Sequence, residues 1–147
     1  MSRFNRILLV SLVLVLAAGL TACAGPKPVV LGGADQDAVL AFSEPAADNL
    51  FAGMNAGDYP VFSRDFDDAM LKAIDEKGFA NLQNSITPKI GQYLSRTVTS
   101  VEDVGEYYRL TYRAGFEQDA NVKVLLTFAK AEPHKVAGLF FTSDKLK

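Results

Sequence analysis

Residues 107–116 read YYRLTYRAGF and residues 122–129 read VKVLLTFA, and these two stretches decide the fold class. Apolar side chains occupy every second position of both, so that each stretch has one apolar side. Successive side chains of a β-strand point to opposite faces of the sheet. The period of two therefore predicts two strands that each bury one face.

Two further strand signals flank these stretches, over about residues 93–101 and 135–142. Short connectors at 103–105, 118–120 and 132–133 separate the four segments, and connectors of this length are typical of hairpins. We expect an antiparallel sheet of about four strands, solvated on its polar face.

The residues before the sheet, 38–91, are predicted to be helical. Pro45 either lies in the first turn of the first helix or kinks a helix that begins near Asp37. Helices followed by strands indicate an α+β fold with the helices packed on the apolar face of the sheet. An apolar stripe at i, i+3, i+4 and i+7 marks the first helix. Its members are Ala47, Leu50, Phe51 and Met54.

Glycine and proline residues predict where the helices end. Gly57 is expected to end the first helix, and Asp58, followed by Tyr59 and Pro60, to begin a short helical turn. Gly78 is expected to break the next helix, and the last helix is expected to stop before Pro88.

The N-terminal segment has the parts of a secretory signal. Arg3 and Arg6 precede an uncharged apolar segment, residues 7–20. Its length is below the ~20 residues that span a bilayer, which weighs against an ordinary membrane anchor. The tetrapeptide that follows, Leu20-Thr21-Ala22-Cys23, resembles a bacterial lipobox.

The lipobox resemblance implies that Cys23 receives a diacylglyceryl group and that cleavage falls between Ala22 and Cys23. A thiol suits this step because it is the most nucleophilic side chain near neutral pH. The chain then divides into a signal peptide (1–22), a lipidated Cys with a flexible tether (23–37) and one domain (38–147). Acyl chains such as palmitate would hold that domain on the cell membrane or outer membrane, outside the cytoplasm.

The charge balance limits the partners of the mature chain. Loss of residues 1–22 removes two of the 15 Lys and Arg residues and leaves 13 against 17 Asp and Glu, a net charge near −4. A mildly acidic domain is not attracted to anionic head groups, so membrane attachment depends on the acyl chains. No motif points to nucleic acid, and the single Cys excludes an intramolecular disulfide.

Three stretches resemble the small exported domains of the DUF3887 family. They are residues 56–70, which include AGDY and FSRDFDDAM, residues 107–117, which include YYRLTY and FE, and residues 136–141, VAGLFF. The resemblance covers about residues 40–147 and implies an NTF2-like fold. In that fold a strongly curved antiparallel sheet clasps the helices and often leaves a conical cavity. The family has no established activity, so the resemblance implies a fold without a reaction.

Few residues indicate catalysis or metal binding. The only histidine, His134, follows Pro133 in a tight connector and is expected to be a solvated turn residue. The acidic series Asp65, Asp67 and Asp68 stops where a calcium loop would continue with a third alternate Asp and a Gly, and apolar residues 69–71 follow instead. We therefore expect these carboxylates at a helix N-terminus, where the dipole favours them. No catalytic residue, metal or cofactor is predicted.

Apolar and aromatic residues on the helix-facing side of the sheet are the candidate binding residues. They either fill the core, which we favour, or line a cavity in an NTF2-like cone. Tyrosine hydroxyls on that side need hydrogen-bond partners, which leaves room for a small polar pocket. The candidates are Tyr108, Tyr112, Phe116, Leu126 and Phe128.

The opposite face of the sheet carries Arg109, Arg113, Lys123 and Lys130. It is either a solvated surface or a surface for an acidic envelope protein or a second copy of the domain. We expect a lipid-anchored, non-catalytic accessory protein of the cell envelope that binds a small ligand or a partner. The alternative is a small isomerase- or dehydratase-type enzyme, with a carboxylate near Tyr108 or Tyr112 in the cone cavity.

Overall fold

An antiparallel sheet of five strands forms the framework of the protein in the computed structural model, which describes residues 27–147. Each strand pairs with the next strand in the chain. The α-helices come after the first strand and before the other four. The expected α+β class is therefore confirmed. The strands are β1 (Val29–Val30), β2 (Tyr93–Asp103), β3 (Tyr107–Phe116), β4 (Asp119–Ala129) and β5 (Val136–Thr142).

The strand beyond the expected count of about four is β1. Val29 pairs with Asp103 and Val30 with Glu102, so β1 lies along the C-terminal end of β2. Two residues are too few to show a period, which is why the sequence did not indicate this strand. The described part of the expected flexible tether, residues 27–37, thus contains β1 and the start of a helix at Gly33.

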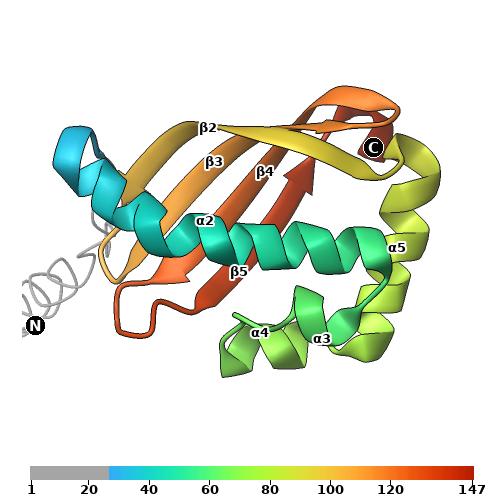
Figure 1. Ribbon diagram of the computed structural model, residues 1–147, viewed down its shortest axis with the longest axis horizontal. Coiled ribbons are helices and arrows are strands. Elements are labelled where there is room, and N and C mark those ends of the chain that lie inside the picture. Colours follow the sequence, from blue (N-terminus) through green and yellow to red (C-terminus); the bar gives the residue numbers. More distant parts are fainter. Residues whose placement is uncertain (1–26) are drawn as a thin grey trace, which may run out of the picture.

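Four α-helices lie between β1 and β2, and a short 3₁₀ helix ends the chain. Figure 1 shows α2 crossing one face of the sheet and α5 standing at the end of the sheet near the C-terminus. Within residues 27–147, no helix combines the length and the hydropathy needed to cross a membrane. The helices are α2 (Gly33–Ala56), α3 (Tyr59–Phe62), α4 (Asp68–Ala73), α5 (Glu76–Ile90) and η1 (Asp144–Leu146).

The ends of α2 and α3 follow the expected residues. Gly57 ends α2 in the left-handed conformation, with φ of 66°. Asp58 then caps α3 by accepting a hydrogen bond from the Val61 N–H at 3.0 Å. Pro45 lies inside α2, which begins even before Asp37, so the helix runs through the proline.

The ends of α4 and α5 differ from the expectation. The break falls at Ile74 and not at Gly78. The Asp75 side chain accepts from the Gly78 N–H at 2.8 Å, and this cap places Gly78 in the first turn of α5. Pro88 lies inside the last turn of α5 and does not end it.

The core lies between α2 and the inner face of the sheet, the face that α2 covers. The predicted stripe of α2, from Ala47 to Met54, is at most 5% exposed, and the alternating apolar residues of β3 and β4 from Leu110 to Phe128 are at most 3% exposed. Register shifts interrupt β2, β3 and β4, for example between Val98 and Ser100. Bulges of this kind bend strands locally.

Candidate functional site

Two groups of polar side chains on the helix-covered side of the sheet are candidates for function. The first, the inner cluster, joins Glu44 and Asp48 of α2 to Arg96 of β2 and Tyr112 of β3. The second, the end pocket, surrounds His134 at the end of the sheet where β1 pairs with β2.

The inner cluster is an ion pair with a buried phenol bound to it. Arg96 Nη2 lies 2.7 Å from Glu44 Oε2 and 2.7 Å from Asp48 Oδ1. The Tyr112 hydroxyl donates to the other oxygen of Glu44, Oε1, at 2.9 Å. The Arg96 side chain is 10% exposed and Tyr112 is fully buried. The cluster therefore joins the middle of α2 to β2 and β3.

The protonation states of the inner cluster suit a structural role. Burial raises the pKa of the Tyr112 phenol well above its ordinary value, and the adjacent Glu44 carboxylate raises it further. Burial by itself lowers the pKa of the Arg96 guanidinium, but hydrogen bonds to Asp48, Tyr93 and Glu44 outweigh burial and raise it. At neutral pH the phenol is thus a hydrogen-bond donor and the guanidinium a cation.

The end pocket has a volume of about 440 Å³. The first turns of α2, the C-terminal end of β2, the start of β3 and the connection between β4 and β5 enclose it. Its lining combines an apolar floor with acidic, phenolic and imidazole groups. The lining residues are Leu31, Asp35, Ala38, Val39, Phe42, Asp103, Tyr108 and His134.

His134 faces α2, in contrast to the expected solvated turn residue. Its ring stacks on Phe42 with centroids 4.0 Å apart and an interplanar angle of 18°. Nδ1 lies 3.2 Å from the Ala129 carbonyl oxygen and Nε2 lies 3.1 Å from Glu132 Oε1. The backbone of His134 has φ of 56°, which is uncommon for a residue with a side chain. The connection between β4 and β5 thus holds the imidazole in the pocket wall.

One residue of the end pocket lining, Asp103 of β2, forms an ion pair. Lys130 Nζ donates to Asp103 Oδ2 at 2.6 Å and lies 5.1 Å from the centroid of the Tyr108 ring. The Lys130 ammonium is the main reason that the pKa of Asp103 is lower than usual. Asp35, in the first turn of α2, adds a second carboxylate to the lining. The pocket can therefore accept hydrogen bonds from a ligand that also has an apolar part.

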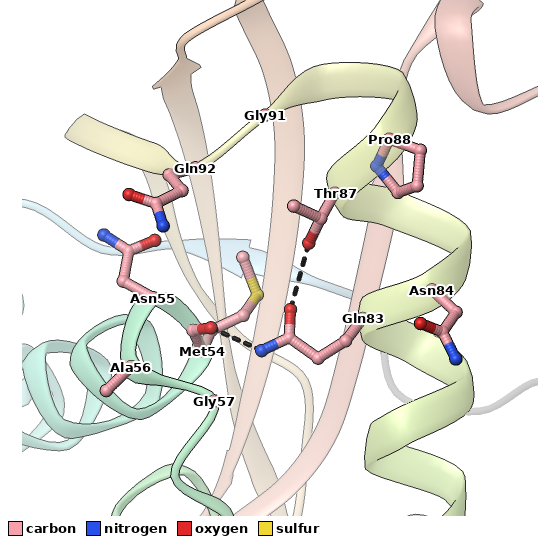
Figure 2. A pocket seen from close by; sticks show the side chains of 10 residues that line it. All are labelled: Met54, Asn55, Ala56, Gly57, Gln83, Asn84, Thr87, Pro88, Gly91 and Gln92. Atoms are coloured by element: carbon pink, nitrogen blue, oxygen red, sulfur yellow. Dashed lines mark hydrogen bonds between the residues drawn. The ribbon is translucent and has the colours of Figure 1, made fainter.

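A second pocket, of about 480 Å³, lies between the C-terminal end of α2 and α5 (Figure 2). Its lining contains no charged residue. Asn55 makes two hydrogen bonds with the backbone of Tyr93, at 2.8 and 2.9 Å. Gln83 donates to the Met54 carbonyl and accepts from Thr87, as Figure 2 shows. These amides join α2 to β2 and α5, so we assign the pocket a structural role.

The structure separates the five candidate binding residues. Tyr108 is half-buried and lines the end pocket. The other four lie in the core, with exposed fractions between 0% and 3%; they are Tyr112, Phe116, Leu126 and Phe128. The predicted lipidation site, Cys23, and the predicted cleavage site, Ala22–Cys23, lie outside the described residues.

The acidic group near α4 is divided among separate roles. Asp67 caps α4 by accepting from the Met70 N–H at 2.7 Å, and Asp68 lies in the first turn. Asp65 accepts from Asn49 Nδ2 at 2.9 Å. Among residues 27–147, no three His, Cys, Asp or Glu side chains are grouped so that they could hold a metal ion.

The basic residues of the sheet do not all share the outer face, the face opposite α2. Arg109 forms an ion pair with Glu102 at 2.6 Å. Arg113 and Lys123 are exposed and lie directly opposite each other in the β3–β4 register. Lys130 contacts the ring of Tyr108 and pairs with Asp103, two residues that line the end pocket.

Comparisons with known proteins give no match: no family model, curated protein or solved structure shows significant similarity to the chain.

Sequence reasoning named Tyr108 and Tyr112 but missed the residues that surround them, although one signal was present. Glu44 lies three positions before Ala47 and seven before Phe51, so it falls on the apolar stripe of α2. A carboxylate at such a position needs a buried partner. The stacking partner of His134, by contrast, is Phe42, which lies far away in the chain and leaves no local pattern.

Proposed function

We propose that the protein is a lipid-anchored component of the cell envelope whose domain binds a small ligand in the end pocket without transforming it. The observation that carries this proposal is the position of the pocket. It lies beside β1, the first described element after Cys23, and Leu31 directly after β1 forms part of its lining. The lipobox resemblance supplies the anchor, and the end pocket supplies the binding site next to it.

The size and lining of the end pocket support a small ligand. Its volume of about 440 Å³ falls in the range of about 300–1,000 Å³ that is usual for small-molecule sites. Val39 and Phe42 give an apolar floor, while Asp35, Tyr108 and His134 offer polar groups. A ligand with an apolar body and a hydrogen-bond donor or a positive charge fits this lining.

The proposal includes an NTF2-like fold for the domain. The bulged, antiparallel β2–β5 and the position of α2 across one face of the sheet support it. The DUF3887 resemblance of residues 40–147 implies the same arrangement.

We favour a non-catalytic domain over the alternative, a small enzyme, because of the state of the carboxylate–tyrosine pair in the inner cluster. That alternative needs a carboxylate–tyrosine pair, and Tyr112 with Glu44 forms one. However, Arg96 occupies Glu44 Oε2 and the Tyr112 hydroxyl occupies Oε1. A carboxylate with both oxygens engaged and a phenol of raised pKa are poorly suited to transfer protons near neutral pH.

Intact-mass spectrometry of protein purified from bacterial membranes tests the anchor. The wild-type chain should begin at Cys23 and carry the mass of two or three acyl chains. The variant Cys23→Ser should accumulate as uncleaved precursor, because a hydroxyl is a far poorer nucleophile than a thiol near neutral pH. Wild-type protein that keeps Met1 and carries no acyl mass contradicts the anchor.

Native mass spectrometry of the same preparation tests the binding site. A non-covalently bound ligand appears as added mass under native conditions and is lost on denaturation. Ala38→Trp fills the end pocket and should abolish that added mass. Ala52→Trp is the matched control, since Ala52 is also exposed on α2 but does not line the pocket. Absence of bound mass from the wild type, or its persistence in Ala38→Trp, contradicts the assignment.

A further inference from the structure

We infer that the end of the domain carrying β1 docks on the surface of the bilayer to which the chain is attached. Val29, Val30 and Tyr107 are the contact residues. We call this end of the molecule the anchored end. The inference rests on the proposed attachment of the chain to a membrane at or before Cys23.

The first argument is the length of chain between the anchor and the fold. Residues 24–28 separate Cys23 from Val29. Six residue steps reach at most about 22 Å even when fully extended, at ~3.6 Å per residue. Whatever conformation these residues adopt, Val29 stays within this distance of the membrane surface.

The second argument is that the chain joins the fold at a fixed corner. Val29 and Val30 pair with the last two residues of β2, and the Leu31 N–H donates to the Val101 carbonyl oxygen at 2.8 Å. Leu94, at the opposite end of β2, lies nine residues from Asp103, which corresponds to about 30 Å at ~3.3 Å per residue. When β2 runs away from the membrane surface, a bilayer that contacts the anchored end is therefore remote from Leu94.

The third argument is the chemistry of the anchored end. Val29 is 58% exposed, Val30 69% and Tyr107, at the start of β3, 43%. Glu102 and Asp103, the strand partners of β1, are ion-paired to Arg109 and Lys130, so their charges are offset. Exposed valines together with a tyrosine suit the interface of a zwitterionic bilayer, where aromatic residues are enriched.

Because the connection between Cys23 and the domain is short, even a weak contact with the membrane is enough to orient the domain. Attachment at Cys23 turns docking into an intramolecular event, for which short linkers give effective concentrations in the millimolar range. Two valines and a tyrosine would not bring a free domain to a membrane, but they can orient a tethered one. This orientation places the end pocket close to the bilayer, because Leu31 directly follows Val30.

Single-tryptophan variants of the full chain test the inference, because the chain contains no Trp. Val30→Trp reports on the anchored end and Leu94→Trp on the opposite end of the sheet. The two positions are matched, with exposed fractions of 69% and 64%. Each variant is purified from bacterial membranes and reconstituted in phosphatidylcholine vesicles, with or without bromine on the acyl chains. We expect brominated lipid to quench the emission of Val30→Trp and to leave that of Leu94→Trp unchanged.

A second reporter shows whether the valines cause the docking. Tyr107→Trp should also be quenched, and adding Val30→Asp to it should reduce the quenching, because a carboxylate is excluded from the interface. Equal quenching at Val30→Trp and Leu94→Trp, or none at Val30→Trp, overturns the inference. So does quenching of Tyr107→Trp that Val30→Asp leaves unchanged.

The intact mass of each preparation separates this inference from the proposed function. Acylated protein without quenching at Val30→Trp leaves the lipid anchor in place and overturns docking. Unacylated precursor with quenching at Val30→Trp supports docking and contradicts lipidation, because residues 7–20 then hold the chain in the membrane. Protein that does not fractionate with membranes at all overturns both.

Discussion

Replacing Arg96 by methionine tests whether the inner cluster holds α2 on the sheet. The substitution removes the guanidinium that donates to Glu44 and Asp48. It keeps an unbranched side chain able to pack on the ring of Phe51, whose centroid lies 5.6 Å from the Arg96 guanidinium carbon. The Glu44 carboxylate then retains the Tyr112 hydroxyl but loses its cation.

The burial of the two charges sets the expected cost. Loss of one partner from a fully buried ion pair costs about 3–5 kcal/mol, whereas an exposed pair contributes about 0–1 kcal/mol. The Arg96 side chain is 10% exposed and that of Glu44 is 35% exposed. We therefore expect a loss of about 2–3 kcal/mol in the free energy of unfolding, between these limits. For a domain of this size, that corresponds to a decrease in Tm of about 6–12 °C.

Urea unfolding followed by far-ultraviolet circular dichroism measures this loss. Asp48→Asn is the control, because the Asp48 side chain is 70% exposed and its pair with Arg96 should contribute less than about 1 kcal/mol. If Arg96→Met costs no more than Asp48→Asn, the inner cluster does not hold α2, and the reasoning from burial is wrong.

Three further changes test other parts of the fold. Gly53→Ala should cost about 3 kcal/mol in urea unfolding, since a Cβ there overlaps the backbone of α3, whereas Gly32→Ala meets open space and should be nearly neutral. Lys123→Glu should raise the free energy of unfolding by about 0.2–1 kcal/mol, because Lys123 lies directly opposite Arg113; a loss contradicts the register. Because the pKa of Tyr112 is raised in the folded state, its neutral phenol stabilises the fold below pH ~10. This contribution is lost as pH rises further, by up to about 1.4 kcal/mol per pH unit, and Tyr112→Phe should remove it from the pH profile.

The sheet and the buried face of α2 were predictable because their signals are local. Alternation over residues 107–116 and 122–129 matches β3 and β4, and the stripe from Ala47 to Met54 is buried. Each pattern reflects one face turned toward the core over eight or more residues. A pattern of that length remains recognisable in the sequence even where the strand has a bulge or an irregular end.

Features determined by single residues were harder to predict. Pro45 is exposed on α2. Water can donate a hydrogen bond to the carbonyl that the proline leaves unpaired, so the helix continues through it. Asp75 caps α5 through the Gly78 N–H, and this cap outweighs the tendency of Gly78 to end a helix. An Asp three positions before Gly78 was a visible signal for that cap.

The end pocket was not predictable because its wall is made by long-range contacts. Phe42 and His134 are 92 positions apart in the chain, and only the fold brings their rings together. A lone histidine after a proline in a connector resembles any turn residue until its partner is known. Tyr108 was the one candidate that reached the pocket, because it is the first inward-facing residue of β3.

The helix α2 links the features on which the proposals rest. Its first turns line the end pocket through Asp35 and Phe42, and its middle is fixed to the sheet by Glu44, two residues after Phe42. The position of the Phe42 ring against His134 therefore depends on the ion pair between Glu44 and Arg96. Loss of that pair should widen the pocket as well as lower stability. Bound ligand mass in Arg96→Met should accordingly fall under conditions in which the domain is still folded, whereas Asp48→Asn should retain it.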